Sequence, residues 1–180
     1  MIPVVVGIDP GLSGAIAYVG PSGDPIARVI PVIKNGTRRS LDLGGIRTMF
    51  AAWKIVGTPG VHVFLERAQP MPRDGAMGAF RYGESYGMLV GCLDGLGLEV
   101  TTVHPATWKS ILFSGTTRTK DDARALAAEV FPSMAPKLVT KVSHNMAEAL
   151  LLAEYGRRVL CGKVAPKTRK TKLVSSQEWI

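Results

Sequence analysis

Two acidic residues end apolar segments that lie far apart in the chain. Asp9 ends the run VVVGID, and Glu66 ends the run VHVFLE. A carboxylate at the end of a buried strand is costly to desolvate unless a cation or a hydrogen-bond donor meets it. If the two strands are parallel neighbours, both acids emerge at one edge of a sheet. Two carboxylates in one small volume raise each other's pKa or need a cation, and Mg²⁺ satisfies several carboxylates while keeping waters for a phosphate substrate. The pair therefore predicts a divalent-metal site.

A third contribution comes from the segment SHNMAEALLLAEYG near the end of the chain. In a helix, His144 and Glu148 are i, i+4 neighbours, while Asn145 and Glu148 are i, i+3 neighbours, so either pair can point together. Glu148 directly precedes the apolar run ALLLA, which predicts that it lies at the end of the helix that faces the sheet. His144 taken alone is more often a packed or solvated residue than a ligand.

Each acid also has an ordinary structural interpretation. DPGLSG after the first strand is common turn chemistry. Glu66 could pair with the adjacent Arg67. Asn145 followed three residues later by Glu148 is also the spacing of a capping box. Taken together and in this order along the chain, however, the acids favour a metal site.

Lys120 stands in an unusual place for a lysine. The segment TKDDARALAAEVF puts it in the first turn of a predicted helix, where the helix dipole favours acids such as Asp121 and Asp122. A locally unfavourable choice often marks function. The structural alternative is an exposed lysine that pairs with neighbouring acids.

The order of elements predicts an α/β protein with a five-stranded mixed sheet. The first three strands are expected to be antiparallel, and the other two to be added by crossover connections. The expected strands cover 4–8, 15–19, 25–33, 61–66 and 99–103. The expected helices cover 41–55, 76–94, 106–112, 120–130 and 146–160.

Composition predicts one domain over 1–160 and a basic tail over 161–180. A chain of 180 residues, 46% of them hydrophobic, can bury one sizeable core. The two isolated cysteines and the absence of an apolar run of about 18 residues predict a soluble protein in a reducing compartment. Residues 157–180 hold seven basic residues and one acid, and so contribute +6 to the net charge of +8. This segment is either an arm for nucleic acid or a solvated tail.

Five motifs together resemble the RuvC-like Holliday junction resolvases of the ribonuclease H-like fold, a family with bacterial, phage and chloroplast members. They are GIDPGLSGAIA, LERAQPMP, HPATWKSILFSG, TKDDARALAAEVFP and HNMAEALLLAEYG, in the family's order. The resemblance covers about 1–160. It implies a homodimer that binds four-way DNA junctions and makes paired nicks, in the cytoplasm of a bacterium or phage host, or in an organelle stroma for a processed chloroplast form.

The resemblance also implies roles for individual residues. Asp9, Glu66 and Glu148 match the metal-binding acids, and Lys120 matches a lysine near the scissile phosphate. The family usually has another acid, or in some members a histidine, shortly before the last acid. Here either His144 is that ligand, or Asn145 stands where an aspartate belongs, in a naturally weakened or engineered inactive protein. Expected DNA contacts are Lys109, Arg118, Lys120, Arg73 and Arg81, with Met77 and Phe80 as wedges at an opened junction or as core residues.

The implied reaction is phosphodiester hydrolysis with Mg²⁺ or Mn²⁺. Two ions about 3.5–4 Å apart would activate a water and stabilise the leaving 3′ oxygen, with no covalent nucleophile and no organic cofactor. One rival is a junction-binding protein without nuclease activity, motivated by Asn145. Another is a phosphate-binding loop of the actin and sugar-kinase kind, which would require a duplicate loop and a second domain.

Overall fold

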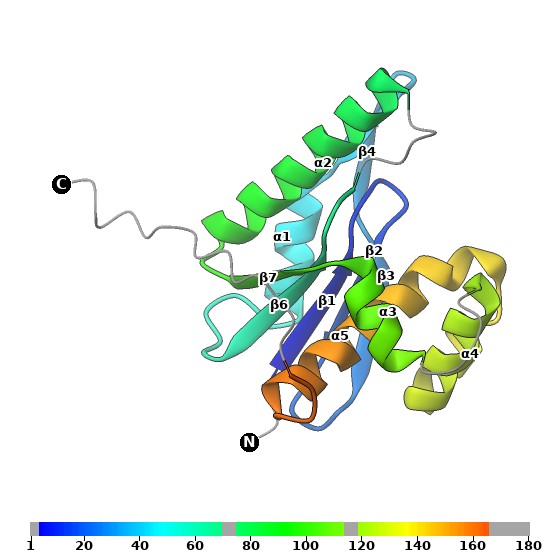
Figure 1. Cartoon of the computed structure of the whole chain (residues 1–180). Coiled ribbons are helices and arrows are strands. Elements are labelled where there is room, and N and C mark those ends of the chain that lie inside the picture. Colours follow the sequence, from blue (N-terminus) through cyan, green and yellow to red (C-terminus); the bar gives the residue numbers. More distant parts are fainter. Residues whose placement is uncertain (1–3, 70–74, 114–118, 166–180) are drawn as a thin grey trace.

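The computed structural model describes residues 4–69, 75–113 and 119–165. A five-stranded sheet of order β3-β2-β1-β6-β7 forms the centre of the molecule (Figure 1). Its strands are β1 (Val4–Asp9), β2 (Ala15–Val19), β3 (Pro25–Val29), β6 (Val61–Glu66) and β7 (Glu99–Val103). Strands β1, β2 and β3 are antiparallel, and β1, β6 and β7 are parallel. The predicted mixed sheet is therefore confirmed.

Helices cover both faces of the sheet (Figure 1). On one face lie α1 (Leu43–Ala52) and α2 (Ala76–Gly95). On the other lie α3 (Pro105–Leu112), α4 (Lys120–Val130) and α5 (His144–Leu160). Two 3₁₀ segments, Pro132–Lys137 and Lys141–Ser143, connect α4 to α5. The predicted helices are confirmed with small changes at their ends.

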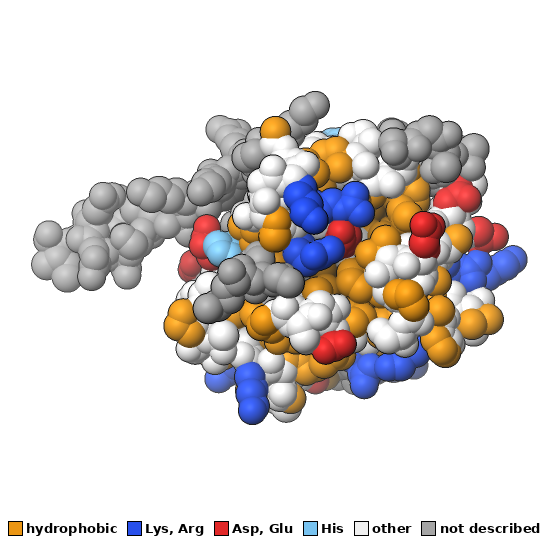
Figure 2. Space-filling model, turned by 90° about the horizontal axis from the view of Figure 1, so that it is seen from below, with side chains coloured by type: hydrophobic (Ala, Val, Ile, Leu, Met, Phe, Trp, Pro, Cys, Tyr) orange, Lys and Arg blue, Asp and Glu red, His pale blue; other side chains and the backbone are white. Residues whose placement is uncertain are grey.

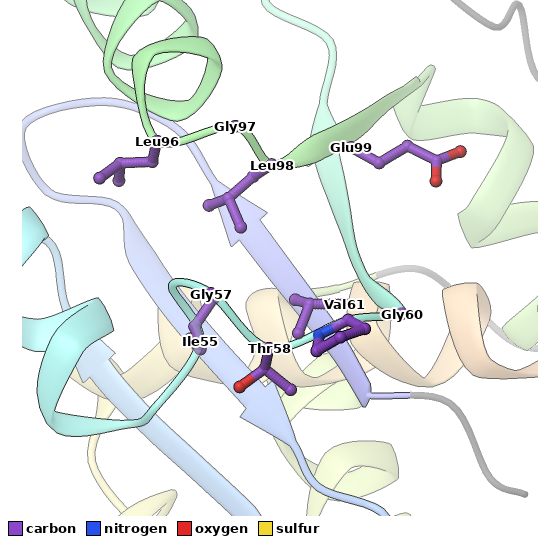
Figure 3. A pocket seen from close by; sticks show the side chains of 10 residues that line it. Ile55, Gly57, Thr58, Gly60, Val61, Leu96, Gly97, Leu98 and Glu99 are labelled. Carbon is purple, nitrogen blue, oxygen red and sulfur yellow. The ribbon is translucent and has the colours of Figure 1, made fainter.

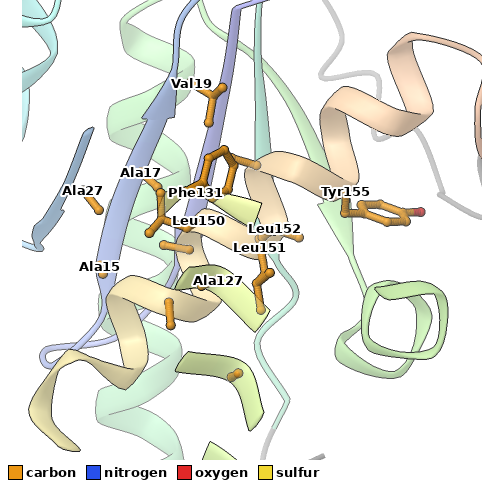
Figure 4. Packing of buried hydrophobic residues seen from close by; sticks show 14 of the residues in the cluster. Ala15, Ala17, Val19, Ala27, Ala127, Phe131, Leu150, Leu151, Leu152 and Tyr155 are labelled. Atoms are coloured by element: carbon orange, nitrogen blue, oxygen red, sulfur yellow. The ribbon is translucent and has the colours of Figure 1, made fainter. Parts of the chain in front are cut away.

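The alternation of side chains along β1 divides the core into two clusters. Val5 packs with α4 and α5, whereas Val6 and Ile8 pack with α1 and α2. The cluster around α5 contains small side chains from β2, such as Ala15 and Ala17, against leucines of the helix (Figure 4). Small residues on the sheet let the helix approach closely.

Gly7 shows how close this approach is. A Cβ atom at Gly7 would lie 2.2 Å from the carbonyl oxygen of Ala149 and 2.5 Å from the nitrogen of Ala153. Only glycine leaves room for the backbone of α5 at this point. Helix α5 therefore lies directly on β1, with its first turns near the carboxyl end of that strand.

The sequence analysis was wrong about 30–41. The predicted strand over 25–33 ends at Val29, and the polar stretch after it forms a hairpin of β4 (Val32–Asn35) and β5 (Arg38–Leu41). Gly36, with φ of +60°, begins the two-residue turn between these strands. A glycine tolerates this conformation, so the overlooked hairpin signal was Gly36-Thr37, a glycine at the first position of a two-residue turn.

Part of the basic C-terminal charge is paired within the fold. Arg157 and Arg158 each donate at 2.7 Å to Glu154, which is 2% exposed. Figure 2 shows one group of basic side chains near the middle of the lower face, and further basic side chains toward its edges. Residues 166–180 lie outside the described part, so the predicted arm or tail stays a prediction. None of the described helices is long and apolar enough to cross a membrane.

Candidate functional site

The parallel pairing of β1 and β6 brings Asp9 and Glu66 together. Ile8 pairs with Leu65 in the register, so the two acids follow side by side at the carboxyl ends of the strands. Each acid lies two residues beyond a position that faces α5, and alternation therefore directs both toward the same helix layer. The predicted edge of the sheet is confirmed.

Glu148, in the second turn of α5, completes the cluster of acids. Burial, followed by the charges of Glu148 and Glu66, raises the pKa of Asp9 to about 8, while Lys109 and Lys120 oppose the shift. Burial also raises the pKa of Glu66. The three carboxylates therefore act on one another, and Asp9 is mostly protonated at neutral pH without a cation.

Two neighbouring residues of α3 hold two of these acids. Trp108, which is fully buried, donates its indole Nε1–H to Glu66 Oε2 at 2.7 Å. Lys109 forms an ion pair with Glu148 through Nζ and Oε1. Helix α3 begins at Pro105, and His104 is its N-cap: the His104 side chain accepts a hydrogen bond from the backbone N–H of Ala106.

Sequence reasoning missed Trp108, although the segment HPATWK was recognised. The available signal was a tryptophan next to a lysine on a short helix, because a buried indole N–H needs an acceptor. A buried acid at the nearby edge of the sheet is such an acceptor.

His144 lies beside the last acid, as the i, i+4 spacing predicts. Its Nε2 is 3.3 Å from Oε2 of Glu148. Burial lowers the pKa of His144, and the charge of Glu148 acts in the opposite direction. His144 is 9% exposed. The imidazole therefore belongs to the acidic cluster and is not a solvated surface group.

Asn145 faces a different partner. Its side-chain amide donates to the carbonyl of Ser13 in the turn between β1 and β2. The capping-box interpretation is wrong, because Ser143 is the N-cap of α5 and makes no side-chain cap hydrogen bond. Asn145 therefore ties α5 to the turn that follows Asp9.

Among the residues that the structure describes, no three acidic, histidine or cysteine side chains form a ready metal-binding group. The carboxylates contact other side chains instead: Glu66 accepts a hydrogen bond from Trp108, and Glu148 pairs with Lys109 and His144. The chemistry of the cluster nevertheless fits a hard divalent cation, since carboxylate oxygens are its preferred ligands. Burial and the charges of Glu148 and Glu66 disfavour the charged form of Asp9, and a bound cation would favour that form.

A pocket of about 400 Å³, called the basic pocket below, borders the site through His144, which contacts Glu148. It is lined by Lys120 and Lys141, by Arg39 of the β4–β5 hairpin, and by His144 and Asn145. Lys120 is the first residue of α4, as predicted, and is exposed. The hairpin that the sequence analysis missed therefore contributes to the surface beside the site.

Helix α2 carries three of the expected DNA contacts. Met77 is 64% exposed and Phe80 is 68% exposed, so the interpretation of these two as core residues is wrong. Arg81 is exposed as well. Arg73 and Arg118 lie outside the described residues.

A second pocket, of about 410 Å³, lies where β6 and β7 begin (Figure 3). Glu99 and Thr58 line it together with glycines and apolar residues. Since β1, β6 and β7 are parallel, this pocket is at the edge of the sheet opposite the acids. It contains none of the predicted site residues.

The chain is similar to known resolvases in sequence and in fold. Over 126 residues, 66% of this chain, it is 30% identical to the chloroplastic Holliday junction resolvase MOC1 of Chlamydomonas reinhardtii. The chain spans 14% of the length of that protein. No family model matches the chain.

Two solved structures of Thermus thermophilus RuvC share its fold. RuvC in complex with a Holliday junction substrate matches with a TM-score of 0.59 and 15% identity, over 88% of this chain and 96% of RuvC. A second RuvC structure matches with a TM-score of 0.55 and 19% identity, over the same shares of each chain. The chain thus has the ribonuclease H-like fold of RuvC and is similar in sequence to a Holliday junction resolvase.

Proposed function

We propose that this chain is a metal-dependent endonuclease that resolves four-way DNA junctions. The observation that carries the proposal is the convergence of Asp9, Glu66 and Glu148, from three distant segments, at one edge of the sheet. Burying a cluster of acids costs desolvation free energy unless a bound cation or a hydrogen-bond donor offsets it. A locally unfavourable arrangement of this kind often marks a functional site.

The residues of the site have separate tasks in this reaction. Asp9, Glu66 and Glu148 would hold Mg²⁺ or Mn²⁺, which supplies an activated water and stabilises the leaving oxygen. Trp108 orients Glu66 through its indole N–H, and His144 restrains the other oxygen of Glu148. Lys120, at the N-terminus of α4 and on the wall of the basic pocket, would bind oxygens of the scissile phosphate.

We further propose that the active form is a homodimer. The described part of one chain carries one such cluster of acids, whereas resolution of a junction needs two cuts related by symmetry. Light scattering of the protein, alone and with a four-way junction, tests this. A single chain per junction at saturating protein would contradict it.

The cleavage test uses a labelled four-way junction with Mg²⁺. Paired nicks should appear with the wild type and disappear with Asp9→Asn, while junction binding persists. Asp94→Asn, an exposed acid on α2, is the matched control and should cleave normally. Undiminished cleavage by Asp9→Asn would refute the proposal.

A junction-binding protein without nuclease activity is the second candidate. Its support is that Asn145, at the place of an expected ligand, donates to the carbonyl of Ser13. Asn145→Asp separates the candidates: a gain from no cleavage to cleavage favours the weakened protein, and wild-type cleavage excludes it. The nucleotide-binding alternative of the actin kind predicts ATP binding, which calorimetry measures.

A further inference from the structure

Lys109 lies in an unexpected place. The sequence analysis expected it on the DNA backbone, but its ammonium contacts Glu148 inside the acidic cluster. The side chain of Lys109 is 25% exposed and that of Glu148 is 12% exposed. A lysine that only awaited DNA would extend its ammonium into solvent, where it is best hydrated.

The charge of Lys109 acts on all three carboxylates. Besides its ion pair with Glu148, it lowers the pKa of Asp9 and the pKa of Glu66. Its ion pair with Glu148 therefore places this charge within electrostatic reach of all three carboxylates. The ring of Trp108, whose centroid is 5.0 Å from Nζ, forms the apolar side of this position.

We propose that Lys109 is a displaceable internal cation, which in the metal-free protein stands where a divalent ion binds and which leaves Glu148 when that ion arrives. This inference rests on the proposed function, because it assumes that the acids bind divalent cations. If Glu148 Oε1 bound the ammonium of Lys109 and a divalent ion at the same time, two positive charges would be in contact and would repel each other. The flexible four-carbon stem of lysine allows the ammonium to move away while the helix stays in place.

The exchange has a consequence for DNA binding. Once released from Glu148, the ammonium becomes available to a phosphate beside Lys120, which also acts on Asp9. Metal binding would then strengthen DNA binding and, by linkage, DNA would strengthen metal binding by the same factor. Lys109 would be the positioning residue that couples the two events.

The test measures Mn²⁺ binding to the DNA-free protein by electron paramagnetic resonance of the free ion. Lys109→Met should lower the Kd for Mn²⁺ by about tenfold or more, because the competing charge is gone. Lys109→Arg keeps the charge and should bind nearly as the wild type does. Lys137→Met, at an exposed lysine of the first 3₁₀ segment, controls for net charge and should change the Kd less than twofold.

The outcomes separate this inference from the proposed function. Equal affinities of Lys109→Met and the wild type would overturn the displacement, while the metal site would remain. No Mn²⁺ binding by any of the four proteins would overturn the metal-dependent function, and the inference with it.

A measurement on the wild type covers the case in which Lys109→Met does not fold. In protein labelled with ¹⁵N-lysine, the side-chain ammonium signal of Lys109 is assigned by its loss in Lys109→Arg. Addition of Mg²⁺ should shift this signal in parallel with binding followed by calorimetry. A signal that stays unchanged at Mg²⁺ saturation would overturn the proposal.

Discussion

Replacement of Asp9 by asparagine should stabilise the metal-free protein at neutral and alkaline pH. The folded protein prefers the protonated form of Asp9, because burial, Glu148 and Glu66 raise its pKa from 3.8 to about 8. The associated stability is fully present below pH 3.8 and is lost as the pH rises through about 8. Asparagine has the same shape and remains neutral, so Asp9→Asn escapes this loss.

The magnitude follows from the shift. One pKa unit corresponds to about 1.4 kcal/mol, so a shift of about four units sets an upper limit of about 6 kcal/mol above pH 8. Because Lys109 and nearby water rearrange around the charged acid, we expect about half of this, roughly 3 kcal/mol, at pH 8. The difference in free energy of unfolding between Asp9→Asn and the wild type should be near zero at pH 4 and should grow steadily from pH 4 to pH 8.

Urea unfolding in EDTA at pH 5, 6, 7 and 8 measures this difference. The exposed Asp94→Asn should stay within about 0.5 kcal/mol of the wild type at every pH. Added Mg²⁺ should stabilise the wild type more than Asp9→Asn, since only the wild type keeps all three acids. A difference that does not change with pH, or an Asp9→Asn protein that is less stable throughout, would refute the reasoning.

Three further changes test other parts of the structure. Gly7→Ala should lower the free energy of unfolding by about 3 kcal/mol, because its Cβ would meet the backbone of α5; urea unfolding measures this, and a loss below about 1 kcal/mol would contradict it. Trp108→Phe should move the acidic limb of the cleavage profile to higher pH, because the indole hydrogen bond lowers the pKa of Glu66; an unchanged profile would show that the bond is unimportant. Arg39→Ala combined with Lys141→Ala should weaken junction binding and reduce the slope of log K against log salt by about 2, as anisotropy titrations can show; an unchanged slope would place DNA elsewhere.

Much of the site could be predicted because its signals are local. The endings of VVVGID and VHVFLE place acids at strand ends, and the spacing of His144 and Glu148 sets them on one side of a helix. Periodicity of two or of 3.6 residues carries such information over a few positions. The β4–β5 hairpin was missed because a short exposed strand has little hydrophobic pattern, so only its Gly36 turn marked it.

Local sequence patterns were enough to predict the order of the helices and strands and the strand ends at which carboxylates come to a sheet edge. The contacts of these side chains became known from the fold: Trp108 donates to Glu66, Lys109 pairs with Glu148, and the Asn145 amide donates to the carbonyl of Ser13. These contacts join segments about 40 to 130 residues apart, as their separations of 42, 39 and 132 show. Such contacts depend on how α3 and α5 pack against the sheet, and no local periodicity encodes that packing.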